Sequence, residues 1–241
     1  MLLVIDIGNT SINNGIFEGK VFKRSFRVPS NAKNLRSIYK KRLNKKIKGV
    51  IIVSVVPKVL KDVERALDRK VLVVGRDVHS GIKNLYKNPK QVGQDRLVNA
   101  RAAYELYGGS SIVVDFGTAI TIDVVNKNKE YLGGVIVPGV EISLEALSNK
   151  AVLLPKVKLE KPKGILGKDT RQSMINGAVY GFSSMCDGII ARYGRRKVIA
   201  TGGMSRLIAP YCKSVNKIDP ELTLKGLRLI YTDDHRLKDT R

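Results

Sequence analysis

Two strand-and-turn segments of the chain repeat one another, and they constrain its fold more than any other feature. LLVIDIGNT occupies residues 2–10 and SIVVDFGTA occupies residues 111–119, so that Asp6 corresponds to Asp115. In each copy an apolar run, typical of a buried strand, leads to a carboxylate and then to a glycine turn. Two further β-rich stretches follow each copy, INNGIFE and VFKRSFRV in the first and ITIDVVN and EYLGGVIV in the second. The sequence therefore predicts a three-stranded meander built twice.

The rest of the chain alternates between strand and helix patterns. Strands are expected at 49–55, 71–75 and 197–203, and helices within 31–47 and at 57–69, 96–108, 140–150 and 170–194. Two such halves predict an α/β protein with a duplicated actin-like (ribonuclease H-like) fold. Each half would hold a mixed sheet flanked by helices, with nucleotide in the cleft between the halves. We place the halves at residues 1–110 and 111–241, and we expect the polar end from residue 232 to fray.

The charge of the chain is unusual. Lys and Arg total 44 against 21 Asp and Glu, which gives a net charge of +23, and no acid occurs from Gly19 to Lys61. Such a stretch could bind nucleic acid. Many of its lysines, however, fall opposite a helical apolar stripe formed by Leu35, Ile38, Tyr39, Leu43 and Ile47. We therefore favour a solvated helix face, since no nucleic-acid motif or interleaved aromatic residue accompanies the charge.

Other composition features restrict the compartment and the metal chemistry. No apolar run reaches the ~18 residues of a membrane span, and Asp6 interrupts the first run too early for a signal peptide. Cys186 and Cys212 are isolated, so a reduced cytoplasmic setting is expected. The two histidines, His79 and His235, are far apart in the sequence, which argues against a histidine metal site.

The first repeat has the chemistry of a phosphate-binding turn. Gly8 lets the backbone turn closely around an anion, while Asn9 and Thr10 offer side-chain donors. Asp6 would hold the water shell of Mg²⁺, which takes few protein carboxylates. A plain hairpin is the alternative, because these are also common turn residues. The second copy strengthens the phosphate interpretation by supplying Asp115, Gly117 and Thr118 on the opposite side.

A second segment, LYKNPKQVGQDRLVNA, has the chemistry of an acceptor site. Asp95 and Arg96 follow Gly93 at the start of a predicted helix, where the helix dipole favours an ionised carboxylate. An ionised Asp95 could accept a hydrogen bond from a hydroxyl, and Arg96 could clamp a carboxylate. The alternative is an ordinary acidic helix start with a surface arginine. The turn ATGG (200–203) would let a flat ligand such as adenine approach, or would simply join a strand to a helix.

Taken in order, DIGNT, Y-x-N-P-x-x-V-G-x-D-R and DFGTA resemble the type III pantothenate kinases. The resemblance continues through SVVP (54–57), GGVIVPG (133–139), GKDTRQSMINGAVYG (167–181), ATGG and DPELTLKGL (219–227). It implies an enzyme that transfers the γ-phosphoryl group of ATP to pantothenate. The product would be 4'-phosphopantothenate, formed in the first step of coenzyme A biosynthesis.

The resemblance also implies roles for single residues. Asp95 would be the proton acceptor, Asp6 would hold Mg²⁺ through its water shell, and Asp115 would bind the monovalent cation, K⁺ or NH₄⁺. The ATP-binding residues would be Asp6, Ile7, Gly8, Asn9, Thr10, Ser11, Ile12, Asn13 and Thr118. The pantothenate-binding residues would be Tyr86, Gly93, Gln94, Asp95, Arg96 and Thr170. The family is a homodimer with active sites at the interface, so Thr170 would reach the neighbouring subunit's substrate.

Two departures from the family pattern affect the expected site. Gln94 stands where a small residue such as Ala is usual, and Ser11 stands where Asn is frequent. Two other functions stay open beside the pantothenate kinase, and the net charge of +23 is the reason to keep the first of them. One is an accessory transcription regulator that binds nucleic acid through its basic surface, although the filled chemical positions argue against a nucleic-acid partner. The other is an actin-like kinase for another small alcohol.

Overall fold

The computed structural model describes residues 1–43 and 46–234 of the chain. His235 and most of the end that was expected to fray lie outside these ranges. The chain forms two compact units, the first from residues 1–102 with the segment that begins at 222, and the second from residues 103–221. Within the described ranges, no helix is both long enough and apolar enough to cross a membrane.

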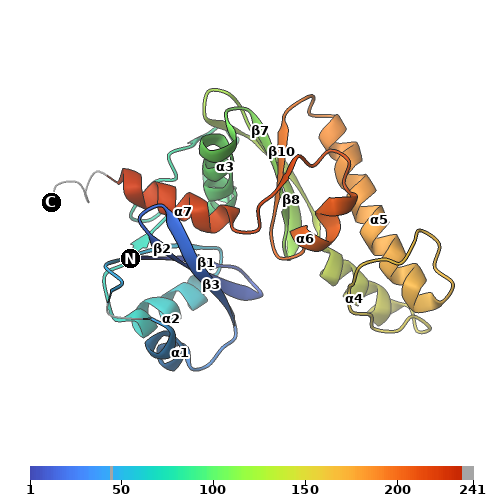
Figure 1. Ribbon diagram of the computed structural model, residues 1–241, viewed down its shortest axis with the longest axis horizontal. Helices are drawn as coiled ribbons and strands as arrows, with labels where there is room; N and C mark the ends of the chain where they lie inside the picture. The colour runs from blue at the N-terminus through green and yellow to red at the C-terminus, as the bar shows by residue number, and fades with distance from the viewer. Residues whose placement is uncertain (44–45, 235–241) are drawn as a thin grey trace. The chain divides into compact units, whose positions relative to one another are not determined.

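The first unit is built on one mixed sheet with strand order β3-β2-β1-β4-β5 (Figure 1). Its elements are β1 (Leu2–Ile7), β2 (Ser11–Glu18), β3 (Val21–Pro29), α1 (Leu35–Arg42), β4 (Gly49–Ser54), α2 (Pro57–Leu67), β5 (Leu72–Val73), β6 (Lys83–Asn84), the 3-10 helix η1 (Pro89–Gln91) and α7 (Leu222–Asp233). Helix α3 (Gln94–Tyr107) begins in this unit. Strand β1 is antiparallel to β2 and parallel to β4.

Alternation along β1 divides this sheet into two covered faces. Leu3, Ile5 and Ile7 pack with the buried residues of α1 and α2. Leu2 and Val4 pack on the opposite face, with residues of α7 and with Val98 of α3. Figure 1 shows the same arrangement, with α1 and α2 on one side of the strands and α7 on the other. Asp6 follows Leu2 and Val4 in this alternation, so its carboxylate belongs to the α3 and α7 face.

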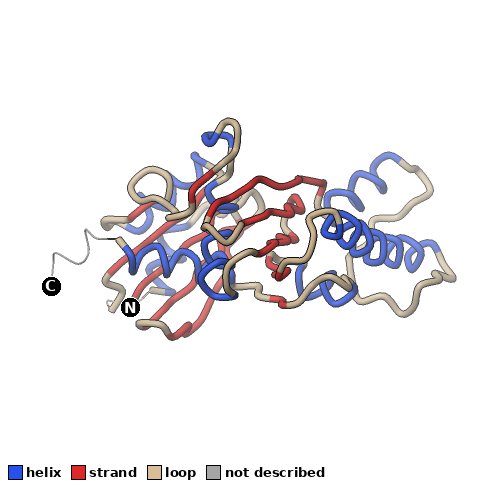
Figure 2. Tube along the Cα trace, turned by 90° about the horizontal axis from the view of Figure 1, so that it is seen from above, coloured by secondary structure: helices blue, strands red, loops and turns tan. Residues whose placement is uncertain are grey.

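Within residues 103–221, the second unit repeats the plan with strand order β11-β10-β7-β8-β9. Its elements are β7 (Ser111–Phe116), β8 (Ala119–Val125), β9 (Glu130–Pro138), α4 (Val140–Lys150), α5 (Thr170–Ala191), β10 (Lys197–Thr201), α6 (Ser205–Ile208), the 3-10 helix η2 (Ala209–Tyr211) and β11 (Lys217–Ile218). Ile112, Val114 and Phe116 pack on residues of α4, α5 and α6. Figure 2 shows the strands of each sheet as red tubes that run alongside one another.

The predicted repeat extends to strand register. Asp6 pairs with Asn13 across β1 and β2, and Asp115 pairs with Thr121 across β7 and β8. The two hairpins differ in their turns, because residues 8–10 join the first pair of strands and only 117–118 join the second. The expected meanders are therefore present in both units, and the turn in the first is one residue longer than the turn in the second.

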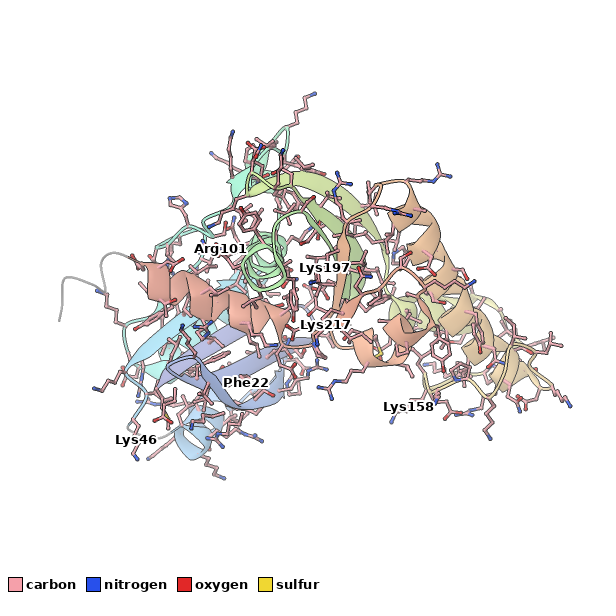
Figure 3. All side chains as sticks on the ribbon, turned by 45° about the horizontal axis from the view of Figure 1, so that its top comes forward. Phe22, Lys46, Arg101, Lys158, Lys197 and Lys217 are labelled. Atoms are coloured by element: carbon pink, nitrogen blue, oxygen red, sulfur yellow. The ribbon has the colours of Figure 1, made fainter. Side chains whose placement is uncertain are left out.

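The observed units differ from the division that we placed at residue 110. Helix α7 belongs to the first unit, because Leu224, Leu227 and Ile230 share a hydrophobic cluster with β1. Arg101 of α3, labelled in Figure 3, also donates a hydrogen bond to Asp233 at the end of α7. An amphipathic pattern alone does not say which of two sheets a helix will cover, so the sequence could not place this one.

The helix expected within 31–47 is shorter than its apolar stripe. It ends at Arg42 because Leu43 is extended, and Ile47 is buried although it lies beyond the helix. The basic side chains at the end of this helix, Lys40, Lys41 and Arg42, are exposed, as the solvated-face interpretation predicts. Other lysines labelled in Figure 3, such as Lys158 and Lys197, belong to the second unit, so the charge is not confined to one helix.

Close packing of α7 on α3 predicts a stability difference between two helical glycines. A methyl group at Gly226 would lie 2.6 Å from the main-chain oxygen of Val98, whereas Gly188 on exposed α5 surface has open space. Gly226→Ala should therefore lower the free energy of unfolding by about 1–3 kcal/mol, which is typical of overpacking. Gly188→Ala should leave it unchanged or raise it by up to ~1 kcal/mol through helix propensity. Urea unfolding of both variants measures this, and equal effects would contradict the packing of α7.

Candidate active site

The turn after β1 is held in place by the end of β3. Gly8 donates its main-chain N–H to the Ser11 oxygen at 3.0 Å. Ser30 closes the turn from outside, because its hydroxyl donates to the Gly8 oxygen at 2.7 Å and its N–H donates to the Thr10 oxygen at 3.1 Å. Asn9 and Thr10 are exposed. The turn thus combines a fixed backbone with side chains that can reach a ligand. Ser30 was not anticipated from the sequence, since only the strand pairing brings it here.

Asp6 belongs to a row of polar side chains that crosses three strands. Asn13 of β2 donates from Nδ2 to Asp6 Oδ2 at 3.0 Å. Arg27 of β3 donates from Nε to Asn13 Oδ1 at 2.9 Å. Both contacts follow from register, because Asn13 is directly opposite Asp6 on one side and Arg27 on the other. The carboxylate is therefore oriented by the sheet itself.

The electrostatics of Asp6 set it apart from an ordinary strand-end carboxylate. Burial raises the pKa of Asp6 from 3.8 to about 6, although the hydrogen bond from Asn13 acts in the opposite direction. The neighbouring carboxylate of Asp95 raises the pKa further, and the positive charge of Arg27 lowers it. Two acidic groups therefore lie near one another in the first unit, and a cation would be favoured beside them.

Asp95 lies in the first turn of α3, beside the turn that follows β1. Its Oδ1 accepts the main-chain N–H of Arg96 at 2.9 Å. Any side chain at Gly93 would overlap this Oδ1 atom, so the glycine makes room for the carboxylate. The loop after β4 links the two segments, since Val55 donates its N–H to the Ile7 oxygen at 3.1 Å and lies beside Gly93. The carboxyl ends of parallel β1 and β4 thus bring the phosphate turn and Asp95 together.

The other residues of this segment that are predicted to bind pantothenate are buried or half-buried. Arg96 is only 7% exposed, so the alternative of an ordinary surface arginine does not hold. Tyr86 is half-buried, and its N–H donates to Asn84 Oδ1 at 3.0 Å. The Gln94 side chain lies against Gly75, where an added methyl group would meet its Cγ at 2.8 Å. Because Gly75 has no side chain, there is room beside it for the side chain of Gln94.

The second unit places Asp115 and Thr118 at the corresponding end of β7. Asp115 is half-buried and pairs in register with Thr201 of β10. Gly202 has φ +91° and lies so close to Asp115 Oδ1 that any side chain there would overlap it. This contact requires the glycine of the ATGG turn whether or not adenine binds there. Thr118 is exposed in the turn, and its main-chain oxygen accepts the N–H of Gly139 at 3.1 Å.

Thr170 is exposed at the start of α5 in the second unit. The preceding residue, Asp169, caps this helix by accepting the N–H of Gln172 at 2.8 Å. Thr170 is therefore not needed as the cap, and in the described part of the chain its hydroxyl has no hydrogen-bond partner. Thr170 could simply be the first residue of its helix. That alternative explains where the residue lies, but it does not explain why the residue is a threonine.

The carboxylates fit the metals expected from the sequence. Among the described residues, no group of three or more His, Cys, Asp or Glu could enclose an ion. Mg²⁺ needs no such group, because it keeps several waters and takes one or two carboxylates together with substrate phosphates. Asp6 and the adjacent Asp95 provide carboxylates of this kind. Asp115 offers the second unit an oxygen ligand suited to a hard cation.

The raised pKa of Asp6 predicts a stability cost that depends on pH. The folded carboxyl titrates near 6 and the unfolded one near 3.8, so the cost develops as pH rises through this window and is complete above it. Asp6→Asn should therefore raise the free energy of unfolding by about 1–3 kcal/mol at pH 8 without metal or nucleotide. At pH 4, near the start of this window, most of the gain should be lost. Urea unfolding at both pH values measures the difference, with exposed Asp62→Asn as the control, and a gain that does not depend on pH would contradict the assignment.

Comparison with known proteins identifies a family and a fold. The family described as type III pantothenate kinase matches residues 2–192. A type III pantothenate kinase of Moorella thermoacetica is 43% identical over 250 residues, which cover 96% of this chain and 98% of the relative. A crystal structure from Campylobacter jejuni, described as a Baf family transcriptional activator, has a TM-score of 0.63 at 20% identity and covers 97% of this chain and 99% of that one. The ROK hexokinase of Thermus thermophilus has a TM-score of 0.50 at 14% identity and covers 99% of both chains. These structural likenesses concern the fold alone, and they confirm the predicted duplicated actin-like fold.

Proposed function

The chain belongs to the type III pantothenate kinase family, and from this membership we infer that it transfers the γ-phosphoryl group of ATP to pantothenate. The product is 4'-phosphopantothenate, and the reaction begins coenzyme A biosynthesis. One observation of the structure carries the inference: the phosphate turn, Asp6 and Asp95 meet at one end of the first sheet. Phosphoryl transfer depends mainly on positioning and charge stabilisation, and this arrangement offers both.

Each residue of the first unit would have a distinct task in this reaction. The main-chain N–H groups and exposed side chains of the turn at Gly8 to Thr10 would bind the ATP phosphates. Asp95 would accept the hydrogen bond of the pantothenate hydroxyl and then its proton. Arg96 and Tyr86 would hold the rest of pantothenate, with Arg96 suited to a carboxylate. Mg²⁺ held by Asp6 through water would offset the negative charge of the transferred group.

Asp115 and Thr118 would complete the site from the second unit. Asp115 would hold the monovalent cation, K⁺ or NH₄⁺, and Thr118 would contact ATP. The exposed position of Thr118 and the half-buried carboxylate of Asp115 at the end of β7 support these roles.

A homodimer would explain exposed apolar side chains in the segment that precedes Thr170. Val152 and Leu153 are 98% and 92% exposed, and Ile165 and Leu166 are also exposed in the segment between α4 and α5. Such residues favour an interface with a second copy of the chain. Thr170 would then reach pantothenate in the neighbouring subunit. A cytoplasmic location fits this function, and both cysteines are buried free thiols.

Replacement of the proton acceptor should separate turnover from nucleotide binding. Asp95→Asn keeps the shape of the side chain but cannot accept the proton, so kcat should fall by roughly 10²–10⁴-fold. The affinity for the Mg²⁺ complex of an ATP analogue should change little. A coupled assay with pantothenate and calorimetry with the analogue measure the two quantities. Exposed Asp62→Asn is the control. A variant that retained wild-type turnover would remove Asp95 from this role.

Removal of the monovalent cation tests the role of Asp115. Without K⁺ or NH₄⁺, we expect phosphopantothenate formation to fall by about tenfold or more and to recover when either ion is added, because the cation offsets charge beside the phosphates. Asp115→Asn should weaken or abolish this response to K⁺. A K⁺ titration of both proteins at constant ionic strength gives the answer. If the variant showed the wild-type K⁺ response, the cation would have to bind elsewhere.

A further inference from the structure

Arg27 is an exposed residue of β3 that is connected to Asp6 without touching it. Its Nε donates to Asn13 Oδ1 at 2.9 Å, and Asn13 Nδ2 donates to Asp6 Oδ2 at 3.0 Å. The register places the three residues side by side on strands β1, β2 and β3. They share the face of the sheet on which α3 carries Asp95, opposite the face covered by α1 and α2.

This bond fixes the orientation of the Asn13 amide. A guanidinium group has only donors, so the atom of Asn13 that faces Arg27 must be the oxygen. The NH₂ group of Asn13 then has to face Asp6, which needs a donor. Arg27 therefore selects the amide orientation that suits the carboxylate, and its positive charge also favours the ionised form of Asp6.

The bond to Asn13 uses only one of the donor groups of Arg27. In the described part of the chain, its two terminal amino groups have no protein partner, and the side chain is exposed. Three residues further along the chain, Ser30 holds the backbone of the Gly8 to Thr10 turn. Arg27 is thus linked to Asp6 through Asn13, and the phosphate turn begins two residues after Asp6. Its planar pair of amino groups matches two oxygens of a phosphate.

We propose that Arg27 is a phosphate-binding residue of this site. Its Nε orients Asn13 and, through Asn13, Asp6, while its terminal amino groups bind oxygens of the ATP phosphates. An arginine in this position would stabilise negative charge on the phosphates without taking the proton from the acceptor. The inference rests on the proposed function only in that ATP is the ligand, and it does not depend on which alcohol receives the phosphoryl group.

The same strand offers a matched control. Arg24 is also exposed, but it lies on the opposite face of the sheet, where it donates to the main-chain oxygen of Arg42. Replacing either arginine by Gln removes one positive charge from the same strand. A difference between Arg27→Gln and Arg24→Gln therefore reports contact with the ligand rather than the general attraction of a basic protein for an anion.

The experiment is a binding series by calorimetry at one ionic strength. The ligands are the Mg²⁺ complex of a non-hydrolysable β,γ-imido ATP analogue and, for comparison, adenosine. Arg27→Gln should weaken binding of the analogue by about 10–100-fold, the range for a charge-assisted hydrogen bond, and should leave adenosine binding within twofold. Arg27→Lys should recover part of the loss, since an ammonium group keeps the charge but not the planar pair of donors. Arg24→Gln should stay within twofold for both ligands.

Two results would overturn the proposal. One is equal binding of the analogue by the two Gln variants. The other is an equal loss for the analogue and adenosine, which would indicate a general change of structure. The acceptor is tested separately, because wild-type protein that bound the analogue but did not phosphorylate pantothenate would contradict the proposed function alone. In that case the binding series would still decide the role of Arg27.

Discussion

The half-buried carboxylate of Asp6 is the constraint on which the rest of the site depends. It lies where β1 leaves the sheet, beside Asp95, and its burial and this neighbour raise its pKa to about 6. A charge in this position is costly unless donors and cations surround it. Asn13 supplies a donor, Arg27 supplies positive charge, and under the proposed function Mg²⁺ supplies the remainder. The neighbouring phosphate turn is held independently, by main-chain bonds and by Ser30.

The two repeats have the same backbone plan and different chemistry. In the first, Asn13 lies opposite Asp6 and donates to it. In the second, Thr121 lies opposite Asp115, but its hydroxyl donates to Asp123 at 2.9 Å. Asp123 is buried and also accepts the Tyr131 hydroxyl at 2.8 Å, so it has a structural role in the sheet. The different tasks expected of Asp6 and Asp115 are therefore accompanied by different neighbours on the adjacent strand.

Local pattern was sufficient to predict most strands and helices, because a buried β1 and an amphipathic α2 show their periods directly in the sequence. It was also sufficient to predict a turn at Gly8 and the start of a helix at Asp95. Features set by pairing over long sequence distance were missed. Arg27 and Ser30 reach Asn13 and Gly8 only through the register of β3 on β2. The two-residue strands β6 and β11 are too short for any period to show.

The contacts that prepare the first unit for phosphoryl transfer all lie within that unit. Asp6, Asn13, Arg27 and Asp95, together with the turn that Ser30 holds, are joined by strand register and by the start of α3. Their geometry therefore does not depend on where the second unit lies. Under the proposed function, these groups are held in position before ATP binds, so that binding adds charge beside them rather than reorganising the residue that accepts the proton.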